Sequence, residues 1–138
     1  MPRFMLFLLL GFSLVTPAAE VLAEEEEEAL GPKVQYIEFE PSFVVNYGSS
    51  GRMKYLRTDV ALRVNDPEAA AKVSLHKPYI QNDLVMLFSA QEPEIMNSSA
   101  GHEKLRQMAL TTVRNLMTRL EGEPCVDDLY FRNLVVQN

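Results

Sequence analysis

The sequence predicts an α+β domain in which an antiparallel sheet carries two to three helices on one side. Two short runs rich in β-branched and aromatic residues, and then one long alternating run, come before residue 65. Amphipathic helical patterns follow them, and an apolar run closes the chain. This order of strands, helices and a final strand favours an α+β domain.

Two strands are expected at the start, over residues 35–39 and 42–47, with Pro41 between them. The stretch 48–51 begins and ends with glycine, which can take positive φ and reverse the chain, so a hairpin should follow. In the next strand, apolar residues and Thr58 alternate with a more polar set: Leu56, Thr58, Val60, Leu62 and Val64 against Tyr55, Arg57, Asp59, Ala61 and Arg63. The first set should face the core and the second set the solvent.

The polar face of this strand has two interpretations. Arg57, Asp59, Arg63 and Tyr55 could form a surface that binds a partner. The pattern favours an ordinary solvated sheet face whose opposite charges pair across strands.

A first helix should begin after Asp66, whose side chain can cap free amides, with Pro67 at the first helical position. Pro78 should break this helix, because proline disfavours helical geometry at Lys77. The helix is expected to resume at Tyr79 and to place five apolar residues on one face: Ile80, Leu84, Val85, Leu87 and Phe88. Residues 89–97 should form a loop.

The longest helix should run from a cap at Ser98 or Ser99 to Leu120 and end at Gly122. Its apolar stripe recurs at spacings of three and four: Leu105, Met108, Ala109, Thr112, Val113, Leu116 and Leu120. The opposite face carries Lys104, Arg106, Arg114 and Arg119, which could meet acidic partners or lipid head groups, although a solvated face is favoured. The last strand, residues 126–137, is apolar on both faces and should lie centrally in the sheet.

The first residues have the pattern of an export signal. Arg3 precedes an apolar run over residues 4–15, which is too short to cross the hydrocarbon layer, and cleavage is expected after Ala23. The alternative is an uncleaved anchor extending to residue 22, which would place Glu20 in lipid. The predicted organisation is therefore a signal peptide or membrane anchor over 1–23, an acidic tether over 24–33 and one domain over 34–138.

Charge and cysteine content exclude several classes. The net charge of the 138 residues is −6, which gives no broad positive field for nucleic acid. Five consecutive glutamates at 24–28 repel each other and suit a solvated tether. Cys125 is the only cysteine, so no intramolecular disulfide can form, and no cysteine follows the apolar run to carry a lipid.

No motif predicts catalysis, a metal or a cofactor. His76, His102 and Cys125 are too few and too scattered for a nucleophile with its base or for a tetrahedral zinc site. Two carboxylate pairs flank turns without the signature of a pocket, and they are Glu92 with Glu94 and Asp127 with Asp128. The glycine turn at 48–51 lacks the helix that would direct amides at phosphate. We therefore expect no catalytic, cofactor-binding or metal-binding residues, and we expect Cys125 to act as a small apolar filler.

Four segments in order resemble the FliL family of flagellar motor accessory proteins. Residues 36–66 (YIEFEPSFVVNYGSSGRMKYLRTDVALRVND) are similar to the family's opening strands and glycine turn, and residues 76–91 (HKPYIQNDLVMLFSAQ) to its His-x-Pro-x-Ile-x-Asn segment. Residues 98–117 (SSAGHEKLRQMALTTVRNLM) resemble its Gly-x-Glu-x-Leu-Arg helix. Residues 126–137 (VDDLYFRNLVVQ) resemble the closing strand, with Leu134 where phenylalanine is frequent.

The resemblance implies a stomatin (SPFH)-like domain and a non-enzymatic role at the flagellar basal body and stator units, supporting rotation, motility and chemotaxis. It also implies a periplasmic location, assembly into a homo-oligomeric ring, and inner-membrane association through residues 1–22. No catalytic residues are carried over. The alternative from a different class is a soluble periplasmic domain that binds lipid or another ligand between helices and sheet, unrelated to motility.

Overall fold

The computed structural model describes residues 33–48 and 51–137, which belong to one compact unit, Pro32–Asn138. The expected signal peptide or anchor over 1–23 lies outside these residues, as do positions 24–32 of the expected tether. The strands are β1 (Gln35–Glu38), β2 (Phe43–Tyr47), β3 (Lys54–Val64) and β4 (Asp128–Gln137). Between β3 and β4 come the four helices α2 (Pro67–Leu75), α3 (Lys77–Ser89), α4 (Pro93–Met96) and α5 (Ser99–Glu121).

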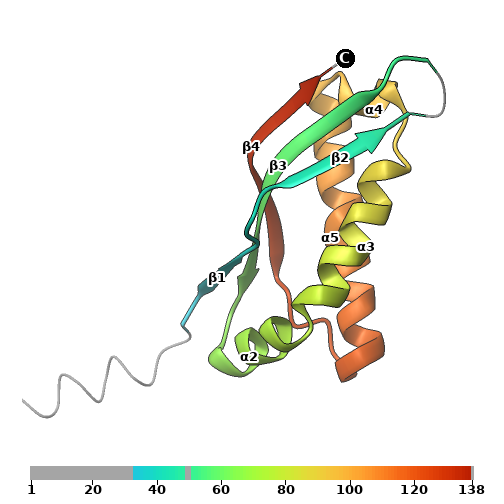
Figure 1. Cartoon of the computed structure of the whole chain (residues 1–138). Helices are drawn as coiled ribbons and strands as arrows, with labels where there is room; N and C mark the ends of the chain where they lie inside the picture. Colours follow the sequence, from blue (N-terminus) through green and yellow to red (C-terminus); the bar gives the residue numbers. More distant parts are fainter. Residues whose placement is uncertain (1–32, 49–50, 138) are drawn as a thin grey trace, which may run out of the picture. The chain divides into compact units, whose positions relative to one another are not determined.

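Helices α3 and α5 lie on the same side of the antiparallel sheet, so one sheet face is covered and the other is open (Figure 1). This arrangement confirms the predicted α+β class. The hairpin predicted at 48–51 is also confirmed, because β2 and β3 pair antiparallel across it, with Val45 opposite Leu56.

Strand β3 is the centre of the sheet. Its first half pairs with β2 and its second half with β1, where Ile37 lies opposite Leu62. Strand β4 pairs along most of β3 on the remaining edge, with Phe131 opposite Val60. The prediction that the last strand lies centrally is therefore wrong, because β4 pairs only with β3 within the described residues.

A β-bulge explains why β4 is apolar on both faces although it is an outer strand. The register shifts between Arg57 and Asp59 of β3, and Asn133 of β4 has a positive φ of 54°. One extra residue in β4 reverses its alternation at this point. Leu129 and Phe131 pack inward before the bulge, and Leu134 and Val136 pack inward after it.

Three phenylalanines from different elements meet in the core. Phe88 of α3 is fully buried, with its ring centroid 5.6 Å from that of Phe43 on β2 and 5.8 Å from that of Phe131 on β4, both in edge-to-face geometry. The predicted inward residues of β3 are all buried, including the hydroxyl-bearing Thr58. Ala61 was predicted to face solvent but is fully buried, since Glu38 and Tyr130 flank it on the neighbouring strands.

The caps of α2 and α5 form as the sequence predicts. Asp66 accepts a 2.7 Å hydrogen bond from the Ala69 amide, Ser98 accepts one of 2.9 Å from the Gly101 amide, and Gly122 ends α5 with φ 80°. The break between the first two helices is confirmed but lies earlier, because α3 begins at Lys77 and not at Tyr79. Pro78 is accommodated in the first turn of α3. The backbone N–H groups of a first turn have no carbonyl partner within the helix, so the N–H that proline lacks costs no hydrogen bond there.

Two other details of the helical region differ from the prediction. The expected loop at 89–97 contains the short helix α4, and α3 continues to Ser89. In α5, Met117 is fully buried, whereas Leu120 is 40% exposed although the spacing places it in the apolar stripe. Helix α4 contacts α5 so closely that a Cβ on Gly101 would lie 2.0 Å from the carbonyl oxygen of Ile95.

Replacing Leu62 by alanine should lower the free energy of unfolding by about 2–5 kcal/mol, because it leaves a cavity under the sheet. Urea denaturation followed by circular dichroism measures this change. Val44→Thr, at a position 64% exposed on the open face, is the control and should change the value by less than about 0.5 kcal/mol. Equal losses in the two variants would contradict the assignment of the faces.

Gly101→Ala should destabilise the domain by about 1–3 kcal/mol, although alanine has the higher helix propensity. The reason is that the new methyl group would overlap the Ile95 backbone, which cannot move aside as a side chain can. Thermal unfolding measures the effect. Lys104→Ala, at an exposed position of the same helix, is the control, and a Gly101→Ala variant at least as stable as wild type would contradict the close approach of α4.

Candidate interaction surfaces

Each of the two histidines and the cysteine contacts a different partner. His76 hydrogen-bonds through Nε2 to the carboxylate of Glu121 at 2.7 Å, and His102 donates through Nε2 to the carbonyl of Met96 at 2.6 Å. The Sγ of Cys125 lies 3.5 Å from the carbonyl oxygen of Glu123. Across residues 33–48 and 51–137, no group of three or more His, Cys, Asp or Glu side chains could hold a metal ion.

The contact of His76 is part of a tie between the α2–α3 joint and the end of α5. His76 is the single residue between the two helices, and its ring bonds to the last residue of α5. Lys72 of α2 pairs with Glu123 at 2.6 Å and with Glu68 at 3.4 Å. The hydrogen bond to Glu123 raises the pKa of Lys72. These contacts give His76 a structural role that requires no catalytic chemistry.

The Sγ of Cys125 contacts the carbonyl oxygen of Glu123 at 3.5 Å and its carboxylate at 3.9 Å, and it forms no hydrogen bond to a histidine among the described residues. Burial, and then the nearby charge of Glu123, raise the pKa of its thiol. A raised pKa lowers the fraction of thiolate, which is the reactive form. Cys125 also has a positive φ of 57°, which is unusual for a residue with a side chain.

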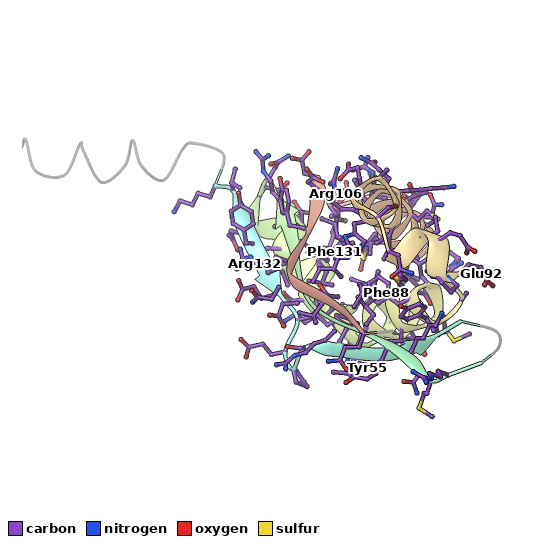
Figure 2. The ribbon with its side chains drawn as sticks, turned by 90° about the horizontal axis from the view of Figure 1, so that it is seen from above. Tyr55, Phe88, Glu92, Arg106, Phe131 and Arg132 are labelled. Atoms are coloured by element: carbon purple, nitrogen blue, oxygen red, sulfur yellow. The ribbon has the colours of Figure 1, made fainter. Side chains whose placement is uncertain are left out.

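The carboxylate pairs singled out in the sequence do not converge. Asp127 lies 3.6 Å from the Nε of Arg63, and Asp128 lies 2.7 Å from an Nη of Arg106. Glu92 is exposed at the start of α4, where Figure 2 places it on the outer side of the helices. The glycines of the 48–51 turn have φ 91° and 89° and lead into β3, so this turn does not direct a helix at phosphate.

Half of the basic face predicted for α5 has a structural role. Arg106 donates to both carboxylate oxygens of Glu103, at 2.7 and 2.9 Å, and bridges to Asp128 and to the Leu129 carbonyl on β4. The hydrogen bond from Arg106 is the main cause that lowers the pKa of Glu103 to about 2. Arg114 likewise donates to the carbonyl of Val126. Only Lys104 and Arg119 of this face remain exposed.

The open face of the sheet divides into two halves at Asp59. On the half nearer β1, charges pair: Arg132 with Glu38, and Arg63 with Asp127. The Asp59 carboxylate accepts hydrogen bonds from Ser42 and from Asn133, the latter at 3.2 Å. Both bonds lower the pKa of Asp59, and the bond from Ser42 has the larger effect. This half is the solvated, charge-paired face that the alternation favoured.

A hollow of about 790 Å³ lies at Asp59. It forms where both neighbours of β3 are irregular, because β1 and β2 are interrupted between Phe39 and Ser42 and the β4 bulge lies opposite. Its charged wall comes from Asp59, Glu38, Glu40 and Arg132. Since Asp59 and Arg132 already have partners within the sheet, these contacts explain the polar lining.

The other half of the open face, nearer the β2–β3 hairpin, is apolar and cationic. Val44, Arg57 and Val135 form one row across three strands, and Tyr55 lies in the next row. We call these four residues the hairpin patch. The sequence indicated Tyr55 and Arg57 as part of a possible partner surface but not Val44 and Val135, because these join them only through the pairing of β2, β3 and β4 and the bulge in β4.

These features define a small α+β domain with one open sheet face, and none of the His, Cys, Asp and Glu clusters among its described residues could hold a metal ion. The family described as "Flagellar basal body-associated protein FliL" matches residues 36–137. The chain belongs to this family, as the order of its motifs predicted.

Curated relatives support the same assignment. The chain is 23% identical over 96 residues to the "Flagellar protein FliL" of Escherichia coli K12 and, with the same values, to that of Shigella flexneri. The match covers 70% of this chain, and the chain spans 61% of the length of these relatives. None of the helices in residues 33–48 and 51–137 has the length and apolarity to cross a bilayer.

Iodoacetamide should alkylate Cys125 several-fold more slowly in the folded chain than in concentrated urea, because the raised pKa keeps the thiol protonated at about pH 8. Mass spectrometry of samples quenched at intervals measures the two rates. The rate in the folded chain should rise with pH beyond the point where an unfolded cysteine has levelled off. Equal rates in both states would show that the thiol is not shielded.

Proposed function

We propose that this chain is a non-enzymatic accessory protein of the flagellar motor. In this role it associates with the basal body and the stator units and supports rotation, motility and chemotaxis. The observation that carries the proposal is the family match, which spans 36–137 and so covers nearly the whole described domain. The names of the relatives in Escherichia coli and Shigella flexneri point to the same organelle.

The non-enzymatic part of the proposal has its own support. Within residues 33–48 and 51–137, His76, His102 and Cys125 each bond to a separate local partner. A nucleophile needs a base within hydrogen-bond reach, and these three residues do not supply such a pair.

We also propose a domain organisation and a location. Residues 1–23 serve as a signal peptide or membrane anchor, 24–33 as an acidic tether, and 34–138 as the periplasmic domain beside the inner membrane. The fold is proposed to be stomatin-like and to assemble into a homo-oligomeric ring. The support for assembly comes from the edges of the sheet. Within the described residues, β4 on one edge and β1 and β2 on the other pair only with β3, and an unpaired strand edge can accept a strand from another chain.

One observation favours the alternative, a periplasmic domain that binds lipid or another ligand. A groove of about 430 Å³ follows α3 and α5, with Leu87 and Met108 in its wall. The space between helices and sheet, however, is occupied by the fully buried Phe88 and the rings beside it. The motor role is therefore the proposal that the observations support better.

Deletion of the gene should reduce swimming in the organism that carries it, and the intact gene should restore it. A fluorescent fusion of the full chain should form foci at basal bodies and lose them in cells without flagella. The variants Cys125→Ser and His76→Ala should restore swimming as the wild type does, because neither residue is expected to act in chemistry. Unchanged swimming after deletion, together with foci that do not depend on flagella, would contradict the motor role.

A further inference from the structure

The hairpin patch combines exposed apolar side chains with an arginine on the central strand of the sheet. Val44 is 64% exposed, Val135 49% and Tyr55 38%. Arg57 lies between the two valines, directly opposite each of them in the strand register. Figure 2 shows Tyr55 and the core residue Phe88 on opposite sides of the sheet, so the patch faces away from the helices.

The positive charge of this half of the face comes from Arg57. Arg57 forms no ion pair with any carboxylate of the described residues. The nearest acidic group along β3 is Asp59, whose oxygens already accept hydrogen bonds from Ser42 and Asn133. These bonds, and to a smaller extent the charge of Arg57, lower the pKa of Asp59. The half of the face nearer β1, in contrast, pairs its arginines with Glu38 and Asp127.

The composition of the patch is that of a binding surface. Tyrosine and arginine are enriched among the residues that carry most of the energy at protein interfaces, whereas exposed valines contribute area and exclude water. Arg57 and Tyr55 both lie on β3, which is paired on both edges, so their backbone is fixed before any partner arrives. A preorganised site loses less conformational entropy on binding.

We propose that the hairpin patch binds an acidic segment of a partner protein, in which a carboxylate pairs with Arg57 and neighbouring apolar side chains cover Val44 and Val135. The charge complementarity calls for an anion, and the apolar row calls for side chains beside it. A symmetric contact between the patches of two copies is disfavoured, because it would bring both Arg57 guanidinium groups together. A protein is favoured over a lipid surface because the row lies on the face of the sheet between neighbouring strands and not on a protruding element.

The inference goes beyond the proposed function, because it concerns the chemistry of one surface and is tested by binding alone. The probe is a fluorescein-labelled peptide of alternating glutamate and valine, titrated with the full chain at low salt and followed by anisotropy. Arg57→Glu should weaken binding by at least about tenfold, since it replaces attraction by repulsion. Arg57→Gln should weaken it less and guards against a folding defect in the first variant, which circular dichroism also monitors.

Arg119→Glu is the matched control, because it makes the same charge change at an exposed position of α5 and should leave binding unchanged. A peptide with lysine in place of glutamate should not bind. Equal weakening by Arg57→Glu and Arg119→Glu, or no binding of the acidic peptide, would overturn the proposal.

Two further measurements distinguish the proposed protein partner from a membrane and from a second copy of the chain. Phosphatidylglycerol vesicles that bind through Arg57, while the peptide does not bind, would replace the protein partner with a membrane. Self-association in sedimentation that Arg57→Glu abolishes, again without peptide binding, would replace it with a second copy. The proposal requires that the peptide binds and that the wild type and Arg57→Glu sediment alike.

Discussion

The pairing of β3 with all three other strands is the constraint on which the described domain depends. β1 and β2 do not pair with each other, and β4 comes back to the sheet only after four helices. Each of them is held in the sheet by hydrogen bonds to β3. A shift of β3 by one residue would turn Leu56, Leu62 and Val64 to solvent and would break the register with every neighbour at once.

The helices are fixed to this strand system by a few specific contacts. Phe88 brings α3 against rings from β2 and β4, and Arg106 connects α5 to the start of β4 through Asp128. Gly101 lets α4 approach α5 at backbone distance, and His76 joins the α2–α3 joint to the end of α5. The covered face of the sheet is therefore occupied, and the open face and the strand edges remain accessible together with the outer surfaces of the helices.

Local chemistry explains how much of the fold could be predicted from the sequence. Asp66, Ser98 and Gly122 mark helix ends because each acts on backbone groups within a few residues, and the alternation in β3 needs no knowledge of its neighbours. The burial of Ala61 and the outer position of β4 could not be predicted, since both depend on which strands lie beside which. The hairpin patch has the same limit, because Val44 and Val135 are far apart in the sequence and meet only across Arg57.

The β4 bulge determines which face of the sheet the residues after Asn133 point to. Before Asn133 the odd-numbered positions Leu129 and Phe131 point to the core, and after it the even-numbered Leu134 and Val136 do. If the same residues formed a regular strand without the bulge, the facing of every residue beyond Asn133 would be exchanged, so that Val135 would enter the core and leave the open face. Deletion of the one extra residue at the bulge would instead give a regular strand with Val135 still opposite Arg57 on the open face, so relatives that lack the bulge should have a strand shorter by one residue with the same apolar positions after it.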